Sequence, residues 1–103
     1  MPVIEVYDPP MCCPTGICGV NIDPVLVQFA ADLKWLQDWE IEVRRYNLSQ
    51  QPEKFVESLA VKQSMALAGE LCLPLTLVDG KVVFRNRYPS RGELAEAVGL
   101  TFE

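Results

Sequence analysis

The chain contains no histidine among its 103 residues, so it lacks the commonest general base and the commonest metal ligand of proteins. No apolar run approaches the roughly 20 residues that a membrane-spanning helix needs. The first Lys or Arg is Lys34, so the preceding stretch lacks the basic region that opens a secretory signal peptide. These absences predict a soluble cytoplasmic protein without membrane insertion, whose cysteines are kept reduced.

Positive charge is also scarce, because 14 acidic residues outnumber nine basic ones and leave a net charge of −5. This balance argues against a large electrostatic footprint for nucleic acid. Half of the residues are hydrophobic, which is enough for a chain of this length to bury one core. We therefore expect a single domain over residues 1–103.

Hydrophobic periodicity and turn signals predict the order β-α-β-α-β-β-α. Apolar residues recur at helical spacing over 24–38, and Asp23-Pro24 is a strong start for this helix. A second helical stretch begins at Pro52, with a break near residue 60 and an end at Gly69. Ser90 and Glu93 form a capping box for the last helix, which Gly99 ends. The predicted strands cover 2–7, 40–46, 75–78 and 81–84.

The two halves of this pattern predict different strand pairings. The βαβ half should be parallel with a right-handed crossover, and the Asp79-Gly80 turn should join two antiparallel strands. The result is a mixed four-stranded sheet in an α/β domain that resembles the thioredoxin fold. In that fold a cis-proline precedes the third strand and faces the loop after the first, which predicts a cis peptide bond at Leu73-Pro74.

Three of the four cysteines lie within seven residues, on the predicted loop between the first strand and the first helix. Prolines and glycines interrupt this segment, so Cys12, Cys13 and Cys18 are placed on irregular backbone. Strand-to-helix loops of α/β proteins commonly carry ligand chemistry. Core thiols do not collect on such loops, so the run is a candidate site. The isolated Cys72, by contrast, is expected to be a buried small hydrophobic residue.

A thiol oxidoreductase and a zinc site are two alternatives for these sulfurs. The run is not Cys-x-x-Cys, and no basic residue lies near it in the sequence to stabilise a thiolate. A disulfide that joins Cys18 to Cys12 or Cys13 remains an alternative under oxidising conditions. A structural zinc site needs a fourth ligand, which only Cys72 can provide, and four thiolates would leave a net charge of −2.

A trivalent metalloid fits the three thiols better than either alternative. Arsenite and antimonite are soft, prefer sulfur and bind three thiolates in a pyramid. Exchange of three hydroxides for three thiols releases water and leaves a neutral centre, which needs no cationic surroundings. Cys12, Cys13 and Cys18 are therefore the predicted ligands of a transient As(III) or Sb(III), with no permanent cofactor and no catalytic turnover.

Several motifs resemble the ArsD family of arsenical-resistance metallochaperones and trans-acting repressors. They are Cys12-Cys13-x-Thr15-Gly16-x-Cys18-Gly19, Tyr46-Asn47-Leu48-x-Gln50-Gln51-Pro52, Leu73-Pro74-Leu75 to Asp79-Gly80, and Arg87-Tyr88-Pro89. The resemblance implies a thioredoxin-like fold, a homodimer, a three-thiol metalloid site, and delivery to the ATPase subunit of an arsenite efflux pump. It also implies weak operator DNA binding. Longer members carry further vicinal cysteine pairs in a C-terminal tail, and the three-thiol site does not depend on them.

The alternative function is a DNA-binding repressor of the resistance operon that metalloid releases. Arg85, Arg87 and Arg91 lie around the last predicted strand and helix and are the candidate phosphate contacts. No helix-turn-helix or basic arm accompanies them. We expect metalloid binding to be the stronger activity.

Overall fold

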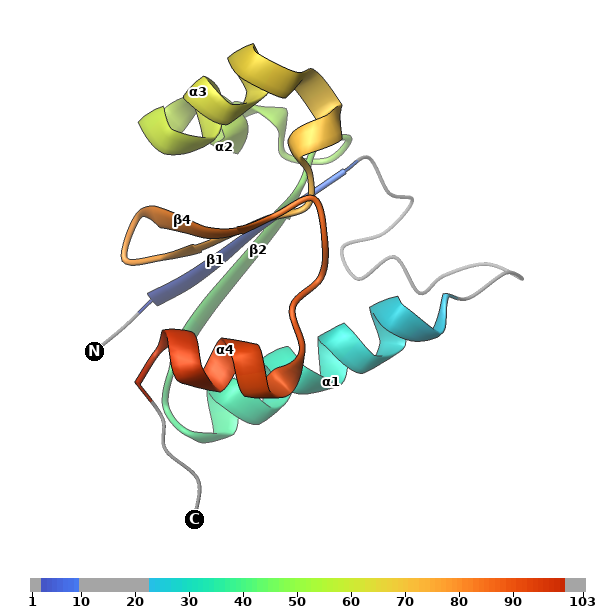
Figure 1. Ribbon diagram of the computed structural model, residues 1–103, viewed down its shortest axis with the longest axis vertical. Coiled ribbons are helices and arrows are strands. Elements are labelled where there is room, and N and C mark those ends of the chain that lie inside the picture. Colours follow the sequence, from blue (N-terminus) through green and yellow to red (C-terminus); the bar gives the residue numbers. More distant parts are fainter. Residues whose placement is uncertain (1–2, 10–22, 100–103) are drawn as a thin grey trace.

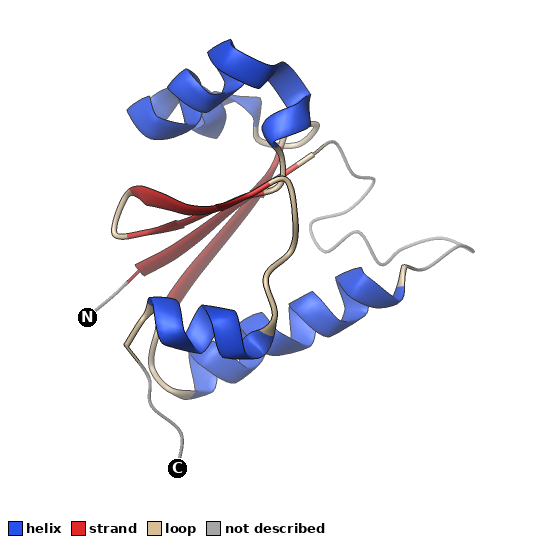
Figure 2. Cartoon of the chain, in the orientation of Figure 1, coloured by secondary structure: helices blue, strands red, loops and turns tan. Residues whose placement is uncertain are grey.

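A four-stranded sheet lies between two pairs of helices in the computed structural model, which describes residues 3–9 and 23–99. The strands are β1 (Val3–Asp8), β2 (Glu42–Asn47), β3 (Leu75–Val78) and β4 (Lys81–Arg85). The helices are α1 (Pro24–Asp38), α2 (Pro52–Glu57), α3 (Leu59–Ala68) and α4 (Arg91–Ala97), with a 3₁₀ turn over Gly69–Cys72. Helices α2 and α3 cover one face and α1 and α4 the other (Figures 1 and 2). The predicted α/β architecture and element order are confirmed.

The sheet has the strand order β2-β1-β3-β4, with β1 and β2 parallel and the other two pairings antiparallel. This is the mixed arrangement of the thioredoxin-like fold. The Leu73–Pro74 bond is cis, as predicted. Since Tyr7 pairs with Leu75, continuing the antiparallel register brings Pro74 opposite Asp8 at the carboxyl end of β1.

Local signals set most element ends. The Asp23 carboxylate accepts a hydrogen bond from the Val25 backbone N–H at 2.9 Å, which caps α1. Ser58 interrupts the predicted helix after Pro52 and caps α3, so the break lies two residues earlier than the pattern suggested. The second strand also begins later than predicted, because Glu40 has a φ of 63° and belongs to a turn.

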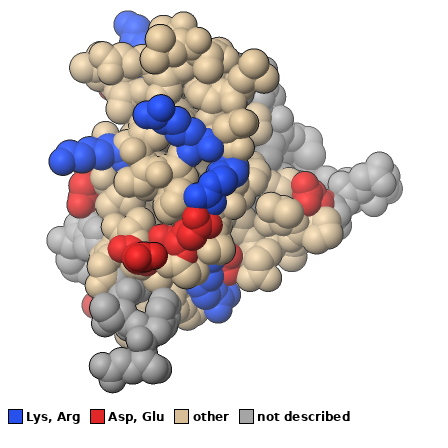
Figure 3. Space-filling view, in the orientation of Figure 1, with Lys and Arg blue, Asp and Glu red and all other residues tan. Residues whose placement is uncertain are grey.

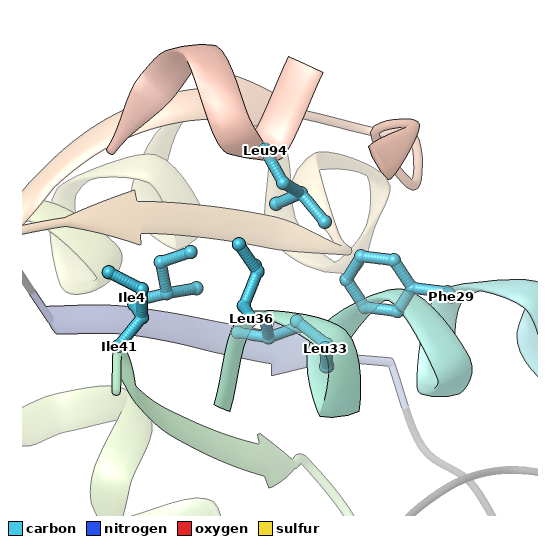
Figure 4. Close-up of a cluster of buried hydrophobic side chains, with 7 residues drawn as sticks. Ile4, Phe29, Leu33, Leu36, Ile41 and Leu94 are labelled. Atoms are coloured by element: carbon cyan, nitrogen blue, oxygen red, sulfur yellow. The ribbon is translucent and has the colours of Figure 1, made fainter. Parts of the chain in front are cut away.

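The buried side chains form one cluster on each face of the sheet. In the α1/α4 cluster, Leu94 of α4 points toward Leu36 and Phe29 of α1 (Figure 4). Leu94 is fully buried, so its truncation to alanine should cost about 2–5 kcal/mol. The α2/α3 cluster comprises Tyr7, Phe55, Val61, Cys72, Leu73, Leu75 and Leu77. Within the described residues, no helix is long and apolar enough to cross a membrane.

Candidate functional site

The predicted ligands Cys12, Cys13 and Cys18 lie outside the described residues, so their arrangement stays a prediction. The structure does describe both flanks of the segment that carries them. Strand β1 ends at Asp8, and α1 begins at Pro24 after its cap. The strand before the cysteine segment and the helix after it are thus confirmed, whereas the placement of the thiols between them stays a prediction.

Asp8, the last residue of β1, is fully buried and forms the centre of a polar network. Its carboxylate accepts hydrogen bonds from Arg45 Nε at 2.6 Å, from Arg45 Nη2 at 3.3 Å and from the Tyr88 hydroxyl at 2.8 Å. A buried carboxylate is costly to desolvate, and a paired guanidinium with a further donor offsets that cost. The network therefore holds the carboxyl end of β1 at a defined place.

The same two donors also contact the helix on the other side of the cysteine segment. The Arg45 guanidinium carbon lies 5.1 Å from the centre of the Phe29 ring, in a cation–π arrangement. The Tyr88 ring lies 4.8 Å from Phe29, tilted by 56°. Asp8 precedes the cysteine segment and Phe29 follows it, so one set of contacts links its two flanks.

The pKa of Tyr88 is raised above its ordinary value. Burial raises the pKa of its phenol, and the neighbouring Asp8 carboxylate raises it further. Both effects disfavour a phenolate, so Tyr88 remains a hydrogen-bond donor to Asp8 throughout the physiological pH range.

Cys72 is buried in the α2/α3 cluster and donates a hydrogen bond from Sγ to the Gly69 carbonyl at 3.1 Å. Burial raises the pKa of this thiol, an effect that the positive charge of Arg85 partly opposes. A neutral thiol in a packed cluster matches the structural role expected for Cys72. It also makes Cys72 a poor fourth ligand for a zinc ion, since the thiolate is the form that binds metal.

The comparisons with known proteins agree with this architecture. The family model described as "Arsenical resistance operon protein ArsD" matches residues 1–103. The chain belongs to the ArsD family. Two ArsD relatives from Escherichia coli, each named "Arsenical resistance operon trans-acting repressor ArsD", are 45% and 43% identical over 103 residues, which is all of this chain and 86% of each relative.

A solved structure extends the ArsD comparison to the fold. The crystal structure of an arsenical resistance operon trans-acting repressor from Bacteroides vulgatus has a TM-score of 0.89 and 38% identity, and the match covers 100% of this chain and 97% of that one. The family and the fold predicted from the cysteine run and its companion motifs are therefore confirmed.

The three arginines predicted as phosphate contacts differ in whether they already form ion pairs with carboxylates. Arg87 forms a bidentate pair with Glu93 at 2.8 and 2.6 Å. Arg91 donates to Asp32 at 2.8 Å and lies over the Trp35 ring. Arg85 makes no ion pair with a described residue. Two of the three candidates thus already bind carboxylates.

Sequence reasoning missed the network around Asp8. A partial signal was present, because the acidic Asp8 directly follows the first predicted strand and the basic Arg45 lies in the second, which was predicted to be parallel to it. The register that brings the two charges together comes from the structure. Tyr88 had no comparable local signal, since it reaches Asp8 across 80 residues of chain.

Proposed function

We propose that this member of the ArsD family binds As(III) or Sb(III) through the thiols of Cys12, Cys13 and Cys18 and delivers the metalloid to the ATPase subunit of an arsenite efflux pump. The observation that carries the proposal is the placement of a Cys-Cys-x₄-Cys run between the two flanks linked by Asp8, Arg45, Tyr88 and Phe29. Linked flanks reduce the conformational freedom that three converging sulfurs must give up on binding.

The chemistry of binding is balanced without a base or an oxidant. Arsenious acid, As(OH)₃, exchanges three hydroxides for three thiols, forming three As–S bonds and releasing three waters. The product is neutral, so it needs no cation, and the guanidinium of Arg45 is already paired with Asp8. The metalloid is cargo that enters and leaves unchanged, so the function is binding and transfer without catalytic turnover. Binding requires reduced thiols, which suits a protein of the cytoplasm. We also propose that the protein acts as a homodimer.

Operator binding is the second candidate function, because both Escherichia coli relatives and the Bacteroides vulgatus protein are named trans-acting repressors. In this function metalloid binding would release the protein from the resistance operon. The charge of −5 and the six cations that pair with carboxylates leave few groups for phosphates. We therefore propose weak, salt-sensitive operator binding alongside metalloid delivery.

Transfer kinetics test the delivery function. Metalloid should pass to the purified ATPase subunit at a rate that rises with ATPase concentration and exceeds spontaneous loss to a small-molecule chelator. Direct thiol exchange predicts this result, because an incoming thiol can displace the original sulfurs one at a time. Equal rates, with no dependence on the ATPase, would make the protein a store or a sensor rather than a carrier.

Operator affinity, measured in parallel at about 0.15 M salt, tests the second function. We expect weak binding that falls steeply as salt is added. Nanomolar operator affinity that metalloid abolishes would make repression the main function.

A further inference from the structure

A groove of about 430 Å³ opens between α3 and β4, on the sheet face away from α1. Its apolar lining includes Ala60, Leu67 and Val82, and Cys72 also borders it. Leu67 is 89% exposed although it lies on the side of α3 that borders the groove. A contiguous apolar surface that is open to solvent, rather than a single exposed leucine, is typical of a site that meets a partner.

The strand that borders this groove is an edge of the sheet. β4 pairs with β3 on one side, and no described strand pairs with its other side. The unpaired backbone N–H and C=O groups of an edge strand can accept an added strand from another chain. The groove thus offers backbone pairing on one side and apolar contact with α3 on the other.

The charge of the groove is positive, in a chain whose net charge is negative. Its charged lining residues are Lys81 and Arg85, and neither forms an ion pair with a described residue. Six of the other seven Lys and Arg residues form ion pairs with carboxylates, and Lys62 forms none with a described residue. On the face shown in Figure 3, basic side chains gather at the level of the sheet with acidic ones below them.

A second copy of this chain is a poor occupant. Antiparallel pairing of two β4 strands about Val83 would place Lys81 of each copy opposite Arg85 of the other. Like charges directly opposite each other destabilise a strand pair, and two chains of net charge −5 also repel overall. The two cations therefore disfavour self-pairing and favour an acidic strand.

We propose that the groove binds an extended segment of a protein partner with alternating acidic and apolar side chains, added as a strand to β4. Backbone pairing with Lys81–Arg85 supplies orientation, the apolar side chains fill the space against Leu67 and Val82, and the acidic ones meet Lys81 and Arg85. This surface contains none of the predicted thiol ligands, so the proposed peptide binding does not depend on metalloid binding.

A synthetic peptide of about six alternating glutamate and valine residues is the probe, and a matched peptide with lysine in place of glutamate is its counterpart. Fluorescence anisotropy at low salt should show saturable binding of the glutamate peptide and none of the lysine peptide. The double variant Lys81→Gln/Arg85→Gln should weaken binding about tenfold, since exposed ion pairs contribute modestly. Lys62→Gln is the matched control, because Lys62 likewise forms no ion pair with a described residue and does not line the groove.

Amide hydrogen exchange locates the bound peptide. Protection confined to 81–85 and to α3 supports strand addition, whereas protection elsewhere, or equal binding of both peptides, overturns the proposal. Loss of operator DNA affinity in the double variant, with peptide binding unchanged, would assign the surface to nucleic acid instead. A shift from dimer to monomer in the same variant would assign it to a second copy of the chain.

Discussion

The Asp8 carboxylate and the Arg45 guanidinium form an ion pair, 2.6 Å apart, between two adjacent parallel strands, with Asp8 fully buried and the Arg45 side chain 11% exposed. Arg45 lies opposite Val6 in the register, so it reaches two residues along the neighbouring strand to meet Asp8. The pair sits at the carboxyl end of β1, immediately before the segment that carries three cysteines. The ion pair thus fixes the end of the strand that leads into the proposed metalloid-binding segment.

Removal of the Tyr88 hydroxyl should weaken both folding and metalloid binding. Tyr88→Phe takes one donor from a buried carboxylate, so the free energy of unfolding should fall by about 1.5–3 kcal/mol. Arsenite affinity should fall by about tenfold, at the low end of the effect of groups that orient metal ligands. Denaturant unfolding and arsenite titration at a temperature where the variant is folded measure the two effects separately.

Tyr46→Phe is the matched control for this substitution, since Tyr46 packs against the α2/α3 cluster, on the opposite face of the sheet from the Asp8 network. Its effect on arsenite affinity should be negligible. Equal affinity in the Tyr88 and Tyr46 variants would show that the network stabilises the fold without positioning the thiols.

Cys72 should react slowly with alkylating reagents. In a variant with Cys12, Cys13 and Cys18 replaced by serine, iodoacetamide should modify native Cys72 at least about tenfold more slowly than in the denatured chain. The reason is twofold: the side chain is buried, and its pKa is raised, so little thiolate is present at neutral pH. Mass spectrometry over time gives both rates, and equal rates would contradict the buried position.

The ion pair between Arg87 and Glu93 should stabilise the protein in a pH-dependent way. The guanidinium of Arg87 and the backbone N–H of Ser90 lower the pKa of Glu93 from 4.5 to about 2. A carboxyl whose pKa is depressed by folding contributes stability above its unfolded pKa and loses that contribution as the pH falls through the folded one. The contribution should thus be complete above pH 4.5 and disappear toward pH 2.

Thermal unfolding of Glu93→Gln across this range measures the effect. The variant should have a slightly lower Tm than the parent chain at neutral pH, and the difference should narrow between pH 4.5 and 2. Glu96→Gln is the control, because it changes the same charge on the same helix without breaking an ion pair between described residues. A Tm difference that does not vary with pH would exclude this ion pair as its cause.

Features that depend on a few adjacent residues were predictable from the sequence. The capping box of Ser90 and Glu93 is present, with both of its hydrogen bonds. Asp79 and Gly80 both have positive φ, as a two-residue hairpin turn of the Asp-Gly type requires. The cysteine run and its companion motifs indicated the family, which the comparisons confirm.

Features that depend on distant residues were not predictable in the same way. The hydrogen bond from Tyr88 to Asp8 forms only once the chain between α1 and α4 has folded. Glu40 was assigned to a strand because its neighbours alternate, yet the close return of the chain from α1 to β2 places it in a turn. Cys72 is different, because its isolation in the sequence already predicted a buried thiol, and its place in the α2/α3 cluster confirms that burial.

An arsenite titration of the reduced protein, combined with X-ray absorption at the arsenic edge, tests the proposed three-thiol site. We expect one arsenic per chain bound by three sulfurs, with strong loss of affinity when Cys12, Cys13 or Cys18 is replaced by serine. Cys72→Ser should bind nearly as tightly as the parent chain. Coordination by four sulfurs, or loss of binding in a folded Cys72→Ser variant, would contradict the three-thiol site.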